Sequence, residues 1–154
     1  MNPGETFLDR LGNRHGGEPT EITSHAGSVR VQVTVRDCDR LAVVCDSLTI
    51  ARARSAGALA RRARAMAGRV SYLEEPLAVI EVDTASRTAV LRSAPPQADG
   101  EHRLFYELAL RDDRVTLQRA RGGGRGTRRR TVPFTLTRGV LSRLINDLAD
   151  CLTS

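Results

Sequence analysis

The chain has 154 residues, of which 40% are hydrophobic, and its formal net charge of +6 comes from 24 arginines and no lysine. This length and hydrophobic content are typical of one domain with a single core and exclude a largely disordered polymer. No apolar run approaches the ~20 residues that span a bilayer, and residues 1–11 lack the apolar stretch of a secretory signal, so we expect a cytoplasmic protein without membrane contact.

The N-terminal segment, residues 1–28, is rich in glycine, histidine, glutamate, threonine and serine. We expect it to be a mobile leader ahead of a single domain that spans residues 29–154. An alternative is that its bulky apolar residues form one docking turn: Phe7, Leu8 and Leu11. Valine then occupies every second position from Val29 to Val35, which predicts a half-buried strand over residues 29–36.

Two interpretations of residues 39–53 remain open. Apolar residues at helical spacing favour a short helix capped by Asp37 or Asp39, and they are Leu41, Val44, Cys45 and Leu48. The β-branched residues of the segment favour instead a pair of strands around Asp46 and Ser47.

A second helix is predicted after Ser55, which is its expected N-cap. Its apolar residues form one stripe, made by Leu59, Ala63, Met66 and Val70. We expect Arg61, Arg62 and Arg64 to face away from this stripe, toward solvent.

Alternation typical of strands replaces the helical period after Tyr72. Leu77–Asp83 is predicted as a strand with Ile80 and Val82 on its inner side, and Thr88–Ser93 as its partner. Residues 103–111 form the next strand, which turns at Asp112 and Asp113 into a strand with Val115 and Leu117 on its inner side. Residues 131–136 are expected to form an edge strand, because Pro133 lies within them.

The last helix has the clearest pattern in the chain. Thr137 is its predicted N-cap, and its apolar stripe consists of Leu141, Leu144, Ile145, Leu148, Cys151 and Leu152. The predicted fold class is therefore α+β: an antiparallel meander of about five strands, with a C-terminal amphipathic helix and one or two N-terminal helices packed against it.

Signatures of catalysis and of metal binding are missing from the sequence. The three histidines are scattered, no Cys-x-x-Cys occurs, and neither a serine nucleophile elbow nor a nucleotide-binding glycine motif is present. The irregular spacing of Cys38, Cys45 and Cys151 indicates reduced core thiols rather than a disulfide framework. We expect no metal and no cofactor, and an enzyme built from dispersed residues, such as His102, Tyr106 and Glu107, ranks last.

Positive charge is concentrated in two stretches. Residues 51–69 hold six arginines and no acid, and residues 111–130 hold eight arginines and two aspartates, whereas the rest of the chain has ten arginines and sixteen acids. Glycines within the second stretch are typical of segments that contact phosphates through arginine. The candidate partner or phosphate contacts are Arg61, Arg62, Arg64, Arg121, Arg125, Arg128, Arg129 and Arg130.

These features favour a non-enzymatic interaction or adaptor module that presents an arginine-rich surface to an acidic protein partner or to a second copy of itself. The alternative is a nucleic-acid-binding accessory protein that uses the same arginines as phosphate contacts. The sequence leaves open whether the two basic stretches share one face.

Overall fold

The computed structural model describes residues 1–16, 18–53, 57–123 and 128–153. Within them lie three helices: α1 (Pro3–Leu11), α2 (Leu59–Arg69) and α3 (Arg138–Cys151). The ten strands are β1 (Thr20–Ala26), β2 (Val29–Cys38), β3 (Ala42–Arg52), β4 (Leu77–Asp83), β5 (Thr88–Ser93), β6 (Gln97–Asp99), β7 (His102–Leu110), β8 (Arg114–Gly122), β9 (Arg130–Val132) and β10 (Phe134–Thr137).

All ten strands belong to one antiparallel sheet, which confirms the α+β class but shows that a prediction of about five strands was too low. The main path is β1-β2-β3-β8-β7-β5-β4, and β10, β6 and β9 pair with β3, β7 and β8 respectively. The sheet is thus two meanders joined side by side. The chain leaves β3, passes through α2, begins the second meander at the far edge and returns until β8 pairs with β3.

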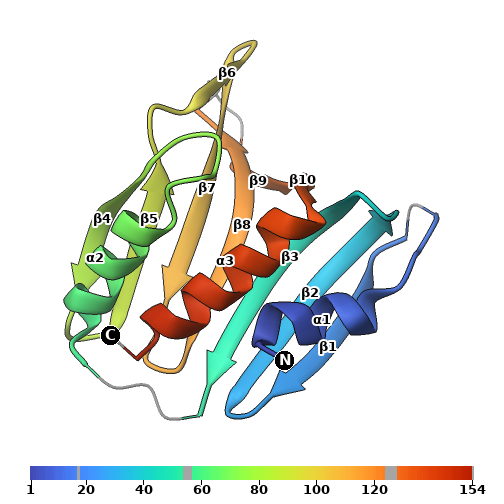
Figure 1. Ribbon diagram of the computed structural model, residues 1–154. Helices are drawn as coiled ribbons and strands as arrows, with labels where there is room; N and C mark the ends of the chain where they lie inside the picture. The colour runs from blue at the N-terminus through green and yellow to red at the C-terminus, as the bar shows by residue number, and fades with distance from the viewer. Residues whose placement is uncertain (17, 54–56, 124–127, 154) are drawn as a thin grey trace.

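The three helices cover one face of this sheet (Figure 1). The apolar stripe predicted for the last helix is buried there, from Leu141 to Leu152, and contributes to the core. Thr137 is the N-cap of α3, since its hydroxyl accepts a hydrogen bond from the Val140 amide at 3.1 Å. The predictions for this helix are confirmed.

The first 28 residues differ from the expected mobile leader. Asn2 caps α1 through the Glu5 amide, and Phe7 and Leu11 are buried in the core. Helix α1 packs so closely on α3 that a Cβ atom at Gly4 would lie 2.4 Å from the Ser142 carbonyl oxygen. The apolar residues of this segment therefore dock as a full helix, a longer element than the single turn considered as the alternative.

Residues 42–52 form one strand, so the predicted helix is wrong. The alternative was right that the segment is β structure, but it expected two strands instead of one. Asp46 of β3 and Arg36 of β2 each have no residue opposite them in the register, which marks two bulges. These two bulge residues form an ion pair at 2.7 Å. The bulge at Asp46 moves the buried positions from Val43 and Cys45 to Leu48 and Ile50. The resulting three-residue step resembles a helical repeat.

Two smaller differences also come from an interruption within a strand, one at a bulge and one at a proline. Ile80 was expected to face inward with Val82, but it lies at a bulge in β4 and is 52% exposed. The strand expected over residues 131–136 is split at Pro133, so that β9 pairs with β8 and β10 with β3. Helix α2 begins after Ala58, and the predicted cap, Ser55, lies outside the described residues.

Candidate functional site

The arginines of α2 do not all face solvent as predicted. Arg61 and Arg64 are exposed, but Arg62 is only 2% exposed. Its guanidinium donates a 2.7 Å hydrogen bond to the Asp112 carbonyl oxygen and lies 3.5 Å from the Asp112 carboxylate. Arg62 thus joins the helix to the β7–β8 turn and is a structural residue.

The helical period contains the signal that locates Arg62. It stands three residues after Leu59 and four before Met66, and side chains at these spacings share one helix face. An arginine within an apolar stripe needs a polar partner at its tip, and the turn at Asp112 supplies a carbonyl oxygen.

In the second basic stretch, Arg119 is buried at 5% exposure on the core side of β8. Its guanidinium lies 3.3 Å from the Glu74 carboxylate, 3.5 Å from the Glu75 carboxylate and 4.3 Å from the centre of the Tyr106 ring. Strand alternation places Arg119 on the same face as Val115 and Leu117, which is the sequence signal that identifies it as buried.

Arg129, a predicted contact residue, is neutralised by an acid. It forms an ion pair with Glu107, which also pairs with Arg92 at 2.6 Å, and both guanidiniums lie over the Phe105 ring. Partial burial would raise the pKa of Glu107, but the hydrogen bonds and charges of Arg129 and Arg92 outweigh this effect and lower that pKa from its ordinary value. The carboxylate is therefore ionised at neutral pH, and Arg129 is engaged.

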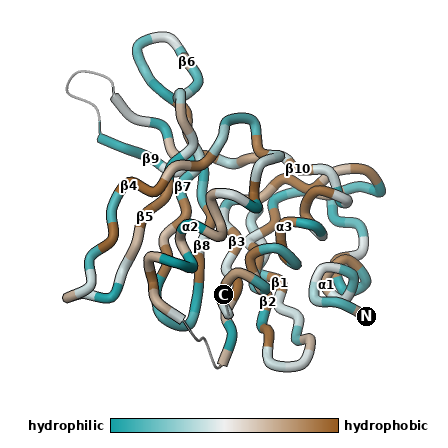
Figure 2. Tube along the Cα trace, turned by 60° about the vertical axis from the view of Figure 1, so that its left-hand side comes forward, coloured by the Kyte–Doolittle hydropathy of each residue, from teal (hydrophilic) through white to brown (hydrophobic). Residues whose placement is uncertain are grey.

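The other arginines of this stretch meet at one end of the sheet. There β6, β7, β8 and β9 lie side by side, so that Gln97, Leu104, Arg121 and Arg130 form one row across the strands. The end of the sheet is hydrophilic at β6 and projects beyond the helices (Figure 2). Arg121 and Arg130 are directly opposite one another, an arrangement in which like charges repel unless an anion lies between them.

A cavity of about 240 Å³ lies at this end and is lined by four basic side chains: His102, Arg121, Arg128 and Arg130. We call these four residues the sheet-end site. No acid is among the described residues that line the cavity, and Asp99 lies beside it, 3.3 Å from Nε of Arg121. Arg128 and Arg130 are exposed and form no ion pair with any residue that the structure describes.

Arg121 has two polar contacts within the protein, and its Nε is the group that favours an acceptor ligand in this cavity. Its Nη2 donates to Nδ1 of His102 at 3.3 Å; because arginine cannot accept a hydrogen bond, that nitrogen must be unprotonated. Its Nε is buried and lies 3.3 Å from the Asp99 carboxylate, an ion pair without hydrogen-bond geometry. Because this donor has no well-oriented acceptor, a bound carboxylate or phosphate oxygen would give it a hydrogen bond.

The two basic stretches do not form one surface. Arg62 of α2 reaches the Asp112 turn, whereas the sheet-end site lies at the other end of the same hairpin (Figure 1). Arg121 lies seven positions after Arg114 along β8, roughly 23 Å of extended strand. Arg125, another predicted contact, lies outside the described residues.

The residues considered for an enzyme do not converge. Tyr106 is in the core and Glu107 lies on the opposite face of β7, as strand alternation requires. Burial raises the pKa of Tyr106 to about 12, of Cys45 to about 12 and of Cys151 to about 11. These groups are therefore protonated at neutral pH, and a protonated thiol is a poor nucleophile.

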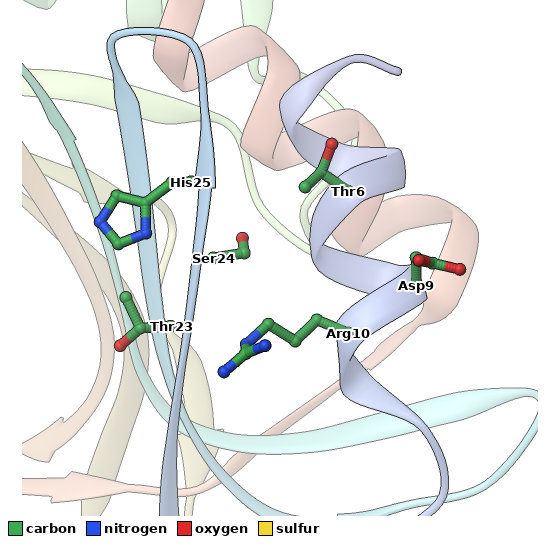
Figure 3. Close-up of a pocket in the computed structure, with 6 residues that line it drawn as sticks. All are labelled: Thr6, Asp9, Arg10, Thr23, Ser24 and His25. Atoms are coloured by element: carbon green, nitrogen blue, oxygen red, sulfur yellow. The ribbon is translucent and has the colours of Figure 1, made fainter.

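A cavity of about 690 Å³ lies between α1 and β1 and is lined by Thr6, Asp9, Arg10, Thr23, Ser24 and His25. A serine, a histidine and an aspartate suggest a hydrolytic triad. Figure 3 shows instead that the side chains of Asp9 and His25 point away from Ser24 on opposite sides, so that no nucleophile and base are paired.

No group of three or more histidines, cysteines or acids in the described parts of the chain is placed to hold a metal ion. None of the described helices is long and apolar enough to cross a bilayer. The chain matches no known family model, and comparison with curated proteins and with solved structures finds no significant similarity.

Proposed function

We propose that this chain is a non-enzymatic interaction module that binds an acidic segment of a partner protein through the sheet-end site. The observation that carries the proposal is the basic cavity itself, where Arg121, Arg128 and Arg130 surround a hollow that no described acid lines. A module of this kind needs no titratable pair and no metal, only cations held close enough to share one anionic partner.

The cavity is large enough to hold carboxylates of a peptide. A volume of about 240 Å³ accommodates one or two small anionic groups, and a guanidinium can bind a carboxylate oxygen pair through two parallel hydrogen bonds. The strand pairing already orders the backbone of Arg121 and Arg130, so little further backbone conformational entropy is lost when a partner binds.

Nucleic acid is the alternative partner, and the aromatic residues make it the weaker one. Single strands bind through bases stacked on exposed rings. Phe7, Tyr106 and Phe134 are buried, Arg92 and Arg129 cover Phe105, and Arg143 lies over the Tyr72 ring at 4.1 Å. Binding of nucleic acid would therefore depend on phosphate contacts alone, with a steep loss of affinity at rising salt.

We further propose that the module acts in the cytoplasm. Its three cysteines are free and buried, an arrangement that suits a reducing compartment.

The test is a titration with a fluorescent peptide rich in glutamate and aspartate. The double variant Arg128→Ser/Arg130→Ser removes two exposed cations from the site and should weaken binding at least about tenfold, since hydrogen bonds to charged groups contribute about 1.5–3 kcal/mol each.

The matched control is Arg61→Ser/Arg64→Ser, which removes the same charge from exposed positions of α2 and should change the affinity less than about twofold. Equal losses for both variants would mean that net charge alone attracts the peptide, and the proposed site would be wrong. A single-stranded oligonucleotide that binds more tightly than the peptide, and loses affinity only in the Arg128/Arg130 variant, would favour the alternative function instead.

A further inference from the structure

The two edges of the sheet are built differently. At one edge, β4 has a bulge at Ile80, which interrupts its register and is a common protection of an exposed edge. At the other edge, β1 pairs with β2 over seven consecutive residues without a register shift, and neither proline nor glycine interrupts it. No described strand pairs with the outer side of β1. This edge is therefore ready to accept another strand.

The turn between β1 and β2 determines which backbone groups of β1 are free. Ala26 pairs with Val29, and Gly27, the first of the two residues between them, has a φ of 60°, in the left-handed region.

 A two-residue turn whose first residue is a glycine with a φ of 60° is typical of type II′, in which the flanking pair is hydrogen-bonded. Hydrogen-bonded and non-hydrogen-bonded pairs alternate along an antiparallel ladder. The N–H and C=O groups of Glu21, Thr23 and His25 therefore point outward, to the open edge.

We propose that β1 pairs with β1 of a second copy of this chain, antiparallel and about a two-fold axis at Thr23. In this register Thr23 lies opposite its own counterpart, and Glu21 of each copy lies opposite His25 of the other. These are the three residues whose backbone groups are free, so about six new hydrogen bonds would form without disturbing β2. A two-fold axis makes the contact closed and self-complementary, which limits the assembly to a dimer.

Charges along this edge support a second copy as the occupant. Glu21 and His25 are exposed on the same face of β1, and the two-fold register brings the acid of one copy to the imidazole of the other. On the other face, Asp9 and Arg10 of α1 line the cavity beside β1 and form no ion pair with any described residue. An edge with both signs of charge matches an inverted copy of itself.

The buried hydroxyl of Ser24 is a second, independent observation. Ser24 is 3% exposed and faces the cavity between α1 and β1, where its Oγ has no hydrogen-bond partner among the described residues. Figure 3 shows Arg10 extending from α1 toward β1 across this cavity. In the proposed register Ser24 lies opposite Ile22 of the second copy, so the unfilled space beside it becomes part of the interface.

Cysteine cross-linking tests the register directly. Thr23→Cys should form an intermolecular disulfide under mild oxidation, because a directly opposite pair has its Cα atoms about 5.5 Å apart. Glu21→Cys and His25→Cys are the matched controls, since each cysteine would lie about 14 Å from its own counterpart. Each control alone should yield at least about tenfold less dimer, whereas an equimolar mixture of the two should form a heterodimer. The native cysteines are buried and should contribute little background.

The wild-type chain provides the second measurement, by sedimentation over a concentration series. It should form a dimer, and Thr23→Pro should remain monomeric while keeping its circular dichroism spectrum, because proline removes an N–H that faces the open edge. A wild type that stays monomeric at every concentration, or equal cross-linking of Glu21→Cys alone and Thr23→Cys alone, would overturn the proposal. Capture of an unrelated extended peptide by a monomeric chain would assign the edge to another partner and would also overturn it.

Discussion

The two basic stretches have the same excess of positive charge in the sequence but different surroundings in the fold. In residues 51–69, Arg62 is buried against the Asp112 turn and Arg69 pairs with Asp147 and Asp150 of α3. In residues 111–130, Arg119 and Arg129 are paired in a similar way, but Arg128 and Arg130 meet Arg121 at one cavity. Among the residues that the structure describes, only those of the second stretch therefore combine cations into a site.

This difference shows that the number of arginines in a segment does not indicate its role. An arginine stabilises the fold where an acid or a carbonyl oxygen is within reach, and it is available to a partner where, as at Arg128 and Arg130, no acid in the described residues pairs with it. The predictions below separate these two roles by comparing arginines from both stretches.

The largest effect is expected at Arg119. Replacing it with methionine would leave Glu75, which is 9% exposed, without its cation, and breaking a buried ion pair in this way costs about 3–5 kcal/mol of unfolding free energy. The measurement is urea denaturation followed by circular dichroism. Arg114→Met is the control, since Arg114 is half exposed beside Asp113, and its loss should cost less than about 1 kcal/mol. Similar values for the two variants would show that Arg119 is not a structural residue.

Arg62 should come next. The variant Arg62→Met removes the hydrogen bond to the Asp112 carbonyl oxygen and should lower the unfolding free energy by about 1–3 kcal/mol. Arg61→Met, one position earlier and exposed on the same helix, should change it by less than about 0.5 kcal/mol. If the Arg61 variant were the less stable one, the assignment of the buried face of α2 would be wrong.

The smallest effect should be the pH dependence at Glu107. Its pKa lies below the ordinary value of 4.5, so its ion pairs stabilise the fold above that value, and this stabilisation is lost as the pH falls through the lowered pKa. Glu107→Gln should therefore be less stable than the wild type at pH 7, by less than about 1 kcal/mol, and the difference should shrink below pH ~4. Denaturation curves at both pH values test this; a difference that grows in acid would contradict it.

Periodicity alone predicted those elements whose buried positions follow an uninterrupted pattern. The valines of β2 alternate from Val29 to Val35, and α3 keeps its stripe from Leu141 to Leu152; all of these residues are buried. The prediction failed for β3, because the bulge at Asp46 changes which alternate positions are buried. Nothing in the local residue order distinguishes that bulge from a helical step.

The sequence predicted that the candidate site is positively charged, but it did not predict which residues form the site. The acids that engage Arg62, Arg119 and Arg129 come from distant parts of the chain, such as Asp112 for Arg62 and Glu75 for Arg119. Their proximity depends on the order of strands in the sheet, which the sequence pattern does not specify. His102 joins the site for the same reason, through pairing of β7 with β8.

The most direct measurement is an NMR titration of arginine-labelled protein with the glutamate- and aspartate-rich peptide, following the Nε–H signals. We predict that the signals of Arg121, Arg128 and Arg130 shift together and saturate at one peptide per chain, while those of Arg61 and Arg64 stay within the change produced by added salt. Equal shifts at Arg61 and Arg64, or no shift at Arg128 and Arg130, would contradict the assignment of the sheet end as the binding site.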